Sequence, residues 1–314
     1  MKKLSEVVAG YQFAHVFSDY MVYFGNKHDG VIELICNTGN SGGIFESGYY
    51  YADTIVKPNV SISAMVGCPV KCDFCELGNE AFGRHLTPDQ MYEQVILILA
   101  HARRFTDIDG RQHKVSIGKS GEPLLNLKLV LGLQRISELG VSFRVPTSFP
   151  RGWVAERILG ELIEFTSQSA EPVQLNISLI STSEEYRAKT TGIGADFPSI
   201  RKGIEKWLTA NPLPKGRKPN AALIIAEDTP IDPYELLKVL PPDLINICFR
   251  PYVETDNGKS SGLRSLSMGK LAVFKQRFEE CGYSVNVAHI STPVEQKFKL
   301  ASNSTLRRYK EQTR

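Results

Sequence analysis

Long hydrophobic runs are scarce in this sequence. No purely apolar stretch is longer than Val95–Ala100, which is far shorter than the roughly 20 residues needed to span a bilayer. Near the amino terminus, Glu6, Gln12 and His15 interrupt the apolar core that a signal peptide requires. We therefore expect a soluble, cytoplasmic protein with no membrane partner.

An excess of one charge is also lacking. The chain has 37 Lys and Arg against 34 Asp and Glu, a formal net charge of +3, which is far from the charge of a protein that coats nucleic acid. Hydrophobic residues make up 42% and charged residues 23%, as in ordinary globular proteins. Together with the absence of repeats and low-complexity tracts, these values exclude collagen-like and wholly disordered chains. At 314 residues, the chain can bury a core without a disulfide or metal to support it.

The pattern along the chain changes near residue 60. Residues 1–60 are rich in Tyr, Phe, Gly and Val and read as short strands and loops, a β-rich amino-terminal extension. From Ser61 onward, strands and helices alternate. The expected strands are Ser61–Met65, Lys114–Ile117, Val141–Val145, Val173–Leu179, Asn220–Ala226, Leu244–Phe249 and a last Ser284–His289. The expected helices are Thr87–Arg104, Leu127–Leu139, Trp153–Phe165, Pro198–Thr209, Pro233–Leu240 and Ser267–Cys281.

This alternation predicts an α/β fold, a partial (β/α)6 barrel related to the TIM barrel, with parallel strands inside and helices outside. The predicted domains are an extension over 1–60, a core over 61–290 and a basic tail over 291–314. In such folds the chemistry lies in the loops that follow the carboxyl ends of the strands. Candidate functional residues are therefore sought in those loops.

The strongest chemical signal is a group of three cysteines, Cys68, Cys72 and Cys75, directly after the first strand of this array. In a reducing compartment, clustered cysteines indicate a metal or redox site rather than disulfides. Thiolates suit zinc and iron–sulfur clusters, but structural zinc normally takes four protein ligands. A zinc site would need Cys36 or His85 as the fourth ligand. Three cysteines on a [4Fe–4S] cluster would instead leave one iron open to another ligand.

The spacing of these cysteines resembles the signature of radical S-adenosylmethionine (SAM) enzymes. The resemblance extends to the RNA adenine methyltransferases of the RlmN/Cfr family over about residues 60–290. Its first part runs through Val66-Gly67-Cys68, Phe74-Cys75, Gly78, Phe82, Arg84, Leu86-Thr87 and Gln94-Val95. Its second part is the run Gly118-Lys119-Ser120-Gly121-Glu122-Pro123-Leu124-Leu125-Asn126-Leu127.

The resemblance implies that Cys68, Cys72 and Cys75 hold a [4Fe–4S] cluster whose open iron binds the methionine part of SAM. An electron donor such as flavodoxin or ferredoxin would then supply the electron that releases a 5′-deoxyadenosyl radical. The SAM-binding residues that the resemblance implies lie at or after the ends of three expected strands. They are Gly121 and Glu122, Ser148, and Ser178, and Asn176 is added because it lies on the same face as Ser178, two residues before it.

Two departures from the family concern its methyl-transfer chemistry. The resolving cysteine lies seven residues before the first cluster cysteine, where this chain has Ser61. The methyl-carrying cysteine lies near the carboxyl terminus, where the stretch around Val294–Phe298 has none. A hydroxyl hardly ionises at neutral pH and cannot easily replace a thiolate nucleophile. Residues 1–60 are also too short and strand-like to match the helical RNA-binding domain of that family.

Several further residues are weaker candidates for catalytic roles: Lys119, Arg250, Tyr252 and His289. Lys119 could hold an anionic substrate or point to solvent, and Arg250 could grip a carboxylate or phosphate or form a surface ion pair. His289 could act as an acid or base, or be a histidine satisfied within the fold. Cys248 and Cys281 are the only candidates for a displaced catalytic thiol, although buried, inert thiols are the alternative.

The sequence thus predicts a radical SAM enzyme that abstracts hydrogen from a small-molecule substrate without methyl transfer. One alternative is a divergent RlmN/Cfr-like methyltransferase acting on RNA or another substrate. Another is a zinc-binding module without enzymatic activity. The sequence does not name the substrate.

Overall fold

The computed structural model describes residues 12–16, 21–24, 31–37, 43–51, 57–213 and 216–288. The chain divides into two compact units. Unit 1 comprises Met1–Pro69, Glu80–Arg144 and Pro293–Arg314, and unit 2 comprises Val70–Asn79 and Val145–Thr292. The domain boundaries expected at residues 60 and 290 remain predictions, and the basic tail over 291–314 lies outside the described residues.

Unit 1 contains the β-rich extension that the sequence predicts. Its first strands are β1 (Gln12–Val16), β2 (Met21–Phe24), β3 (Val31–Asn37) and β4 (Ile44–Tyr50), each antiparallel to the next. Next to β4 lies β5 (Asn59–Ser61), antiparallel to β4 but parallel to β8 (Lys114–Ser116). In turn, β8 is parallel to the first half of β9 (Ser142–Thr147). At β5 the sheet therefore changes from antiparallel hairpins to parallel crossovers.

Two helices cover this part of the chain: α2 (Pro88–Ala102) and α3 (Leu129–Ser137), which pack against each other. The sequence predicts the start of α2 well. Thr87 accepts a hydrogen bond from the backbone N–H of Gln90, and the Gln90 side chain accepts one from the backbone of Thr87. This capping box fixes the first turn. The same unit holds the short pair β6 (Met65–Val66) and β7 (Arg84–His85) and the 3-10 turn η3 (Pro123–Leu125).

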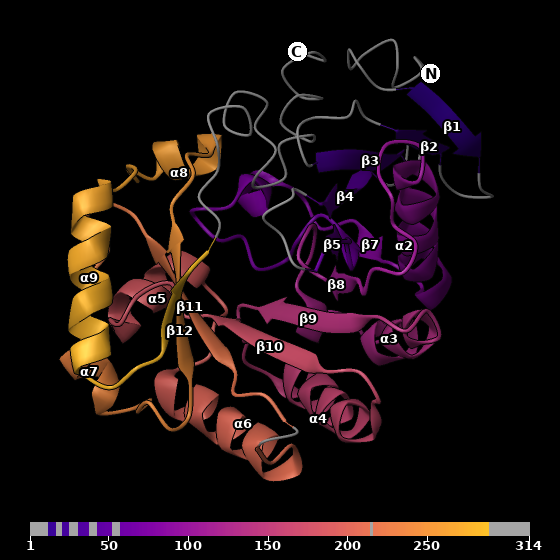
Figure 1. Cartoon of the computed structure of the whole chain (residues 1–314). Coiled ribbons are helices and arrows are strands. Elements are labelled where there is room, and N and C mark those ends of the chain that lie inside the picture. The colour runs from indigo at the N-terminus through magenta and orange to yellow at the C-terminus, as the bar shows by residue number, and fades with distance from the viewer. Residues whose placement is uncertain are drawn as a thin grey trace. The chain divides into compact units, whose positions relative to one another are not determined.

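Unit 2 is built from parallel strands with helices between them (Figure 1). Its strands are β10 (Val173–Ser178), β11 (Asn220–Ile225), β12 (Asn246–Pro251) and β13 (Val285–Val287). Its helical elements are η2 (Glu76–Asn79), α4 (Trp153–Gln168), α5 (Glu184–Thr191), α6 (Phe197–Ala210), α7 (Pro233–Leu237), α8 (Asp256–Ser260) and α9 (Met268–Glu280). Figure 1 shows α4 and α6 side by side, where they pack together.

The parallel α/β prediction is confirmed, and most expected elements lie within a few residues of their predicted places. The strand expected at Leu244–Phe249 begins later, at Asn246, and the strand expected to reach His289 ends at Val287. The helices α5 and α8 were not predicted. Their sequences, EEYRAKTT and DNGKS, carry no apolar stripe to signal a helix.

Each unit buries its own apolar core. In unit 1 the core residues with no exposed surface include Tyr49, Val60, Met91, Val95, Ile98, Val115 and Leu133. In unit 2 they include Leu175, Ile177, Ile204, Trp207, Leu223, Ile247 and Phe249. Hydrophobic burial of this kind provides the main stabilisation of both units. Among the described residues, no helix is both long and apolar enough to cross a membrane.

A buried histidine on α2 makes the stability of the protein dependent on pH. Burial, together with the smaller effect of the charge of Arg104, lowers the pKa of His101 from 6.5 to about 4. The folded protein therefore keeps this ring neutral, while the unfolded chain binds a proton below about pH 6.5. The contribution of His101 to stability is complete above that pH and is lost as the pH falls towards 4.

We expect the melting temperature of the cluster-free protein to fall between pH 6.5 and 4.5, and the His101→Leu variant to fall less steeply. Circular dichroism melting curves at several pH values would measure this difference. Equal slopes for the two proteins would show that His101 does not carry the effect.

Candidate active site

The Gly-Glu-Pro turn of unit 1 packs against the segment that leads into Cys68. The backbone N–H groups of Ala64 and Met65 both donate to the carbonyl oxygen of Ser120, at 2.9 and 3.1 Å. The N–H of Ser120 donates in return to the hydroxyl of Ser63 at 3.1 Å. These bonds fix the turn after β8 relative to the chain that precedes the first cysteine.

Gly121 occupies a position that only glycine can take without disturbance. Its φ is +98°, a left-handed conformation that residues with a Cβ rarely adopt. A Cβ at this position would lie 2.6 Å from both Cβ and Cγ of Met65. The close approach of the two chain segments therefore depends on the missing side chain.

Glu122 is a buried carboxylate held by its own turn. It is 4% exposed, and its Oε1 accepts a hydrogen bond from the N–H of Leu124 at 3.0 Å. Nearby, the fully buried amide of Asn126 donates to the carbonyl oxygens of Ala64 and Leu86. The predicted SAM-binding carboxylate thus lies in a turn fastened to both ends of the segment that contains Cys68.

Lys119 does not point to solvent. Its side chain is 5% exposed, and its Nζ lies 3.7 Å from Oε1 of Glu46 on β4 and 5.8 Å from the centre of the Tyr50 ring. Glu46 is likewise buried, and neither of its carboxylate oxygens has a hydrogen-bond partner among the described residues. The charge of Lys119 is therefore balanced within the fold, which weakens its candidacy as a binder of anionic substrates.

The cysteine loop continues from Cys68 in unit 1 to Cys72 and Cys75 in unit 2. Within unit 2, the N–H of Cys75 donates to the carbonyl of Cys72 at 3.1 Å, and the N–H of Gly78 donates to that of Cys75 at 2.9 Å. The N–H of Asp73 donates to the carbonyl of Thr190, at the end of α5, at 3.1 Å. The loop is thus folded on itself and tied to a helix far along the chain.

The donor set of this loop suits a soft metal centre. The side chains of Cys68, Cys72 and Cys75 are each partly exposed, which leaves each of them accessible to a metal. Among the described residues, no group of three or more His, Cys, Asp or Glu side chains is already gathered around a metal position. Assignment of a cluster to these cysteines therefore remains a proposal that rests on their spacing and on the chemistry of thiolates.

Arg187 on α5 joins two of the predicted SAM-binding strand ends. It is 1% exposed, and its guanidinium donates to the carbonyl oxygens of Ser178, Ser148 and Ala195. Ser148 itself is buried, as is Asn176, whose side-chain oxygen accepts a hydrogen bond from the amide of Asn220 at 3.0 Å. Within unit 2, one buried cation therefore links the backbone of Ser148 to that of Ser178.

Backbone strain is found at the same strand ends. Phe149, just beyond β9, has a φ of +54°, and Ile180, just beyond β10, has a φ of +71°. Lys71, within the cysteine loop, has a φ of +55°. Non-glycine residues in this region cost of the order of 1–3 kcal/mol and tend to occur at functional sites.

The structure describes the surroundings of two further catalytic candidates, Tyr252 and Arg250. The hydroxyl of Tyr252 accepts a hydrogen bond from the N–H of Thr255 at 3.1 Å and lies 3.4 Å from the Thr255 hydroxyl. Tyr252 is 5% exposed, so its visible role is to support the turn that starts α8. Arg250 lies on β12 beside Ile224 and is partly exposed. His289 lies outside the described residues.

The remaining thiols and Ser61 lie in ordinary packed positions. Ser61 ends β5 and is 8% exposed, and Cys248 on β12 is 6% exposed. Cys281 ends α9, and burial raises its thiol pKa. Since α9 runs into the amino end of β13, Cys281 lies at the edge opposite the carboxyl ends of the strands. The side chain of Cys36 lies outside the described part of the structure.

Sequence reasoning missed Arg187 and the segment around α8. The signals for both were faint. An arginine in a polar helix is usually a surface residue, and Asp256-Asn257-Gly258 reads as a turn. Only the contacts in unit 2 show that both segments hold the loops in which the predicted site lies.

Comparison with known proteins supports the resemblance found in the sequence. No family model matches the chain. The dual-specificity RNA methyltransferase RlmN of Marinobacter nauticus is 26% identical over 294 residues, covering 88% of this chain and 73% of that protein. Among solved structures, a radical SAM methyltransferase from Sphaerobacter thermophilus has a TM-score of 0.71 at 19% identity. That match covers 91% of this chain and 79% of the other.

A second solved structure, SuiB of Streptococcus suis bound to S-adenosylmethionine, has a TM-score of 0.53 at 15% identity. It covers 75% of this chain and 51% of SuiB. The predicted fold class, a mixed α/β fold of the partial-barrel kind found in radical SAM proteins, is therefore confirmed.

Proposed function

We propose that this chain, which resembles the RlmN-like branch of the radical SAM superfamily, cleaves S-adenosylmethionine reductively and abstracts hydrogen from a small-molecule substrate. When bound, a [4Fe–4S] cluster would supply the electron for cleavage of the sulfonium bond of SAM, which would release a 5′-deoxyadenosyl radical. One observation carries the proposal. The three-cysteine loop begins on the segment whose backbone is fastened to the Gly121–Glu122 turn.

The residues of this chain would divide the binding work between them. The thiolates of Cys68, Cys72 and Cys75 would hold the cluster, leaving one iron without a protein ligand. Glu122, kept buried by its turn, would accept hydrogen bonds from the ammonium group of SAM. Ser148, Asn176 and Ser178 would also bind SAM, as the family resemblance implies. An electron donor such as flavodoxin or ferredoxin would reduce the cluster.

We propose a reaction without methyl transfer because both thiols of the family's methyl-transfer chemistry are missing. A serine, Ser61, stands at the position of the resolving cysteine. The other thiols offer poor replacements. Burial raises the pKa of Cys281, which keeps it protonated at neutral pH, and Cys248 is enclosed in β12.

The second candidate function is methyl transfer to RNA or another substrate by a divergent route. It is favoured by the similarity to two methyltransferases, RlmN of Marinobacter nauticus and the radical SAM methyltransferase of Sphaerobacter thermophilus. A zinc-binding module without activity is a third reading. Purified protein containing zinc and no iron would favour that reading.

The experiment that separates these functions measures two products in one sample. Anaerobically reconstituted protein is incubated with SAM and dithionite, with and without RNA or metabolite extract. We expect 5′-deoxyadenosine to form without S-adenosylhomocysteine. If both products appear together with a methylated substrate, the proposal of a non-methylating reaction is wrong. If iron binds but neither product forms with any addition, the proposed SAM cleavage is contradicted.

A further inference from the structure

The segment after β12 grips the cysteine loop at several points. Asn257, in the short helix α8, donates from Nδ2 to the carbonyl oxygen of Cys72 at 3.1 Å and to that of Cys75 at 3.2 Å. Both acceptors are backbone groups of predicted cluster ligands. One side chain, more than 180 residues away in sequence, thus fixes the spacing between two of the three cysteines.

The orientation of the Asn257 amide is set by a third hydrogen bond. The side-chain amide of Asn79 donates to Oδ1 of Asn257 at 2.8 Å. Because Oδ1 accepts this bond, Nδ2 is directed to the two cysteine carbonyls, where only a donor is useful. Both ends of the Asn257 amide therefore have suitable hydrogen-bond partners. An aspartate would still accept the hydrogen bond from Asn79, but it could not donate to the two cysteine carbonyls.

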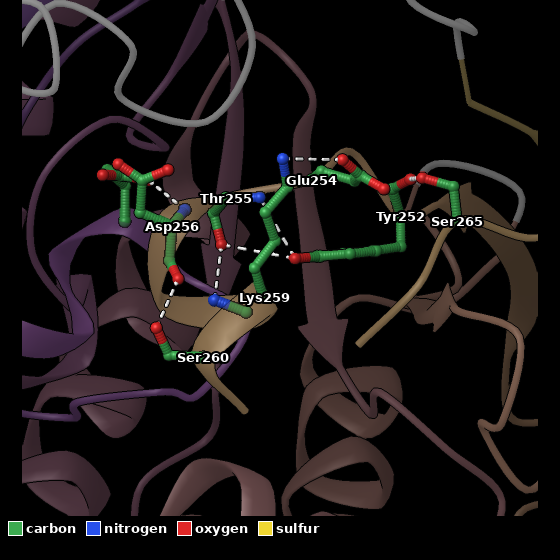
Figure 2. Close-up of polar contacts among 9 residues, drawn as sticks. Tyr252, Glu254, Thr255, Asp256, Lys259, Ser260 and Ser265 are labelled. Carbon is green, nitrogen blue, oxygen red and sulfur yellow. Dashed lines mark hydrogen bonds and ion pairs between the residues drawn. The ribbon is translucent and has the colours of Figure 1, made fainter. Parts of the chain in front are cut away.

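The neighbours of Asn257 hold the same loop. The hydroxyl of Thr255 donates to the carbonyl of Phe74 at 3.0 Å, and the N–H of Asp256 donates to Oε2 of Glu76 at 3.2 Å. Figure 2 shows that Thr255 lies beside the hydroxyl of Tyr252, whereas Ser260, on the exposed side of α8, donates to the carbonyl of Asp256. The Nζ of Lys259 lies 2.9 Å from Oε2 of Glu254 in an exposed ion pair.

The cysteine loop is shaped to receive this contact. A Cβ on Gly78 would overlap the side-chain amide of Asn257 and would lie 2.5 Å from the carbonyl oxygen of Cys72. Gly78 thus leaves the space through which Asn257 reaches the loop. Both the space at Gly78 and the hydrogen-bond acceptors of the loop therefore fit the Asn257 side chain.

We propose that Asn257 is a positioning residue for the cluster, holding the backbone of Cys72 and Cys75 so that their thiolates face one cluster. This inference rests on the proposed function, because it assumes that these cysteines are the ligands. Outer-shell groups that orient ligands typically change metal affinity or activity by about 10–100-fold. Hydrogen bonds to the ligand backbone also alter the charge distribution around the cluster and hence its reduction potential.

The test compares Asn257→Ala and Asn257→Asp with Ser260→Ala, a matched control on the exposed side of the same helix. The first readout is hydrogen exchange of peptides covering residues 70–79 in cluster-free protein, which needs neither cluster nor SAM. The second is the rate of cluster loss, followed by absorbance after dilution into chelator. The third is the reduction potential of the reconstituted cluster.

We expect faster exchange of residues 70–79 and roughly tenfold faster cluster loss in both Asn257 variants, with a shifted potential in Asn257→Asp. The Ser260→Ala protein should match wild type. Asn257→Asp keeps the shape of the side chain, so it serves if the alanine variant does not fold. Wild-type exchange and cluster retention in Asn257→Asp, or equal effects in Ser260→Ala, would overturn the proposal.

The outcome is separable from that of the proposed function. If wild-type protein takes up no iron, the proposed function fails, while the exchange measurement on cluster-free protein still reports whether Asn257 holds the loop. If wild type binds the cluster and cleaves SAM but the Asn257 variants behave like Ser260→Ala, only the positioning role fails.

Discussion

Replacing Cys75 with alanine is expected to abolish iron–sulfur cluster binding and SAM cleavage. The loop offers three thiols, and an alanine leaves a cluster with two protein ligands and a second exposed iron. Cluster assembly should then fail, because each thiolate both neutralises charge and forms a direct metal bond. We expect 5′-deoxyadenosine formation to drop by at least about 100-fold, since the loss of a ligand exceeds the 10–100-fold effect of outer-shell changes.

The matched control for this variant is Cys281→Ala. Cys281 is also a partly exposed thiol of unit 2, but it lies at the end of α9. Iron and sulfide analysis of both reconstituted proteins would measure the effect, alongside product formation. Full iron content and wild-type SAM cleavage in Cys75→Ala would remove the three-cysteine loop as the cluster site. Loss of activity in Cys281→Ala with a normal cluster would point to the displaced-thiol route of methyl transfer.

The Gly121→Ala variant is expected to lose both stability and SAM affinity. An alanine at a φ of +98° is strained, and its methyl group would meet the side chain of Met65 at 2.6 Å. Backbone strain of this kind costs of the order of 1–3 kcal/mol, and overpacking costs a similar amount. We expect a combined loss of about 3 kcal/mol in the free energy of unfolding.

The same change would move Glu122, which directly follows the strained residue. Displacing a buried charged hydrogen-bonding group costs several kcal/mol of binding in well-ordered sites. We therefore expect SAM affinity to fall by at least about tenfold. Urea unfolding would measure the stability, and equilibrium dialysis of SAM with reconstituted protein would measure the affinity.

Gly140→Ala separates the two causes. Gly140 also has a left-handed conformation, with a φ of +64°, but a Cβ there would meet nothing within 4 Å. It should show only the cost of the conformation, about 1 kcal/mol, with unchanged SAM affinity. If Gly121→Ala lost no more stability and no more SAM affinity than Gly140→Ala, the close approach to Met65 would contribute to neither property.

Much of the fold was predictable because its signals are local. The capping box at Thr87 and Gln90 marks the start of α2 whatever lies around it. The apolar run of β11 indicates a buried parallel strand in the same way, and the alternation of apolar and polar residues in β10 is typical of a strand. By contrast, α5 and α8 are too short and too polar to be recognised, since their helical conformation depends on contacts with residues distant in the chain.

The candidate site likewise combines features with a local sequence signal and features that depend on long-range contacts. The spacing of Cys68, Cys72 and Cys75 and the run around Gly121 and Glu122 are readable in the sequence, because each lies within a few adjacent residues. The sequence alone therefore determined the chemical class of the site, and comparison with relatives supports that class.

Only the tertiary structure decided what holds the site in place. Arg187 reaches the ends of two strands, and Asn257 reaches the backbone of two cysteines. It also decided that Lys119 is balanced by Glu46 instead of facing solvent. Such contacts join residues far apart in the chain through specific hydrogen bonds and charges. No local pattern encodes them, because they exist only once separate segments are packed together.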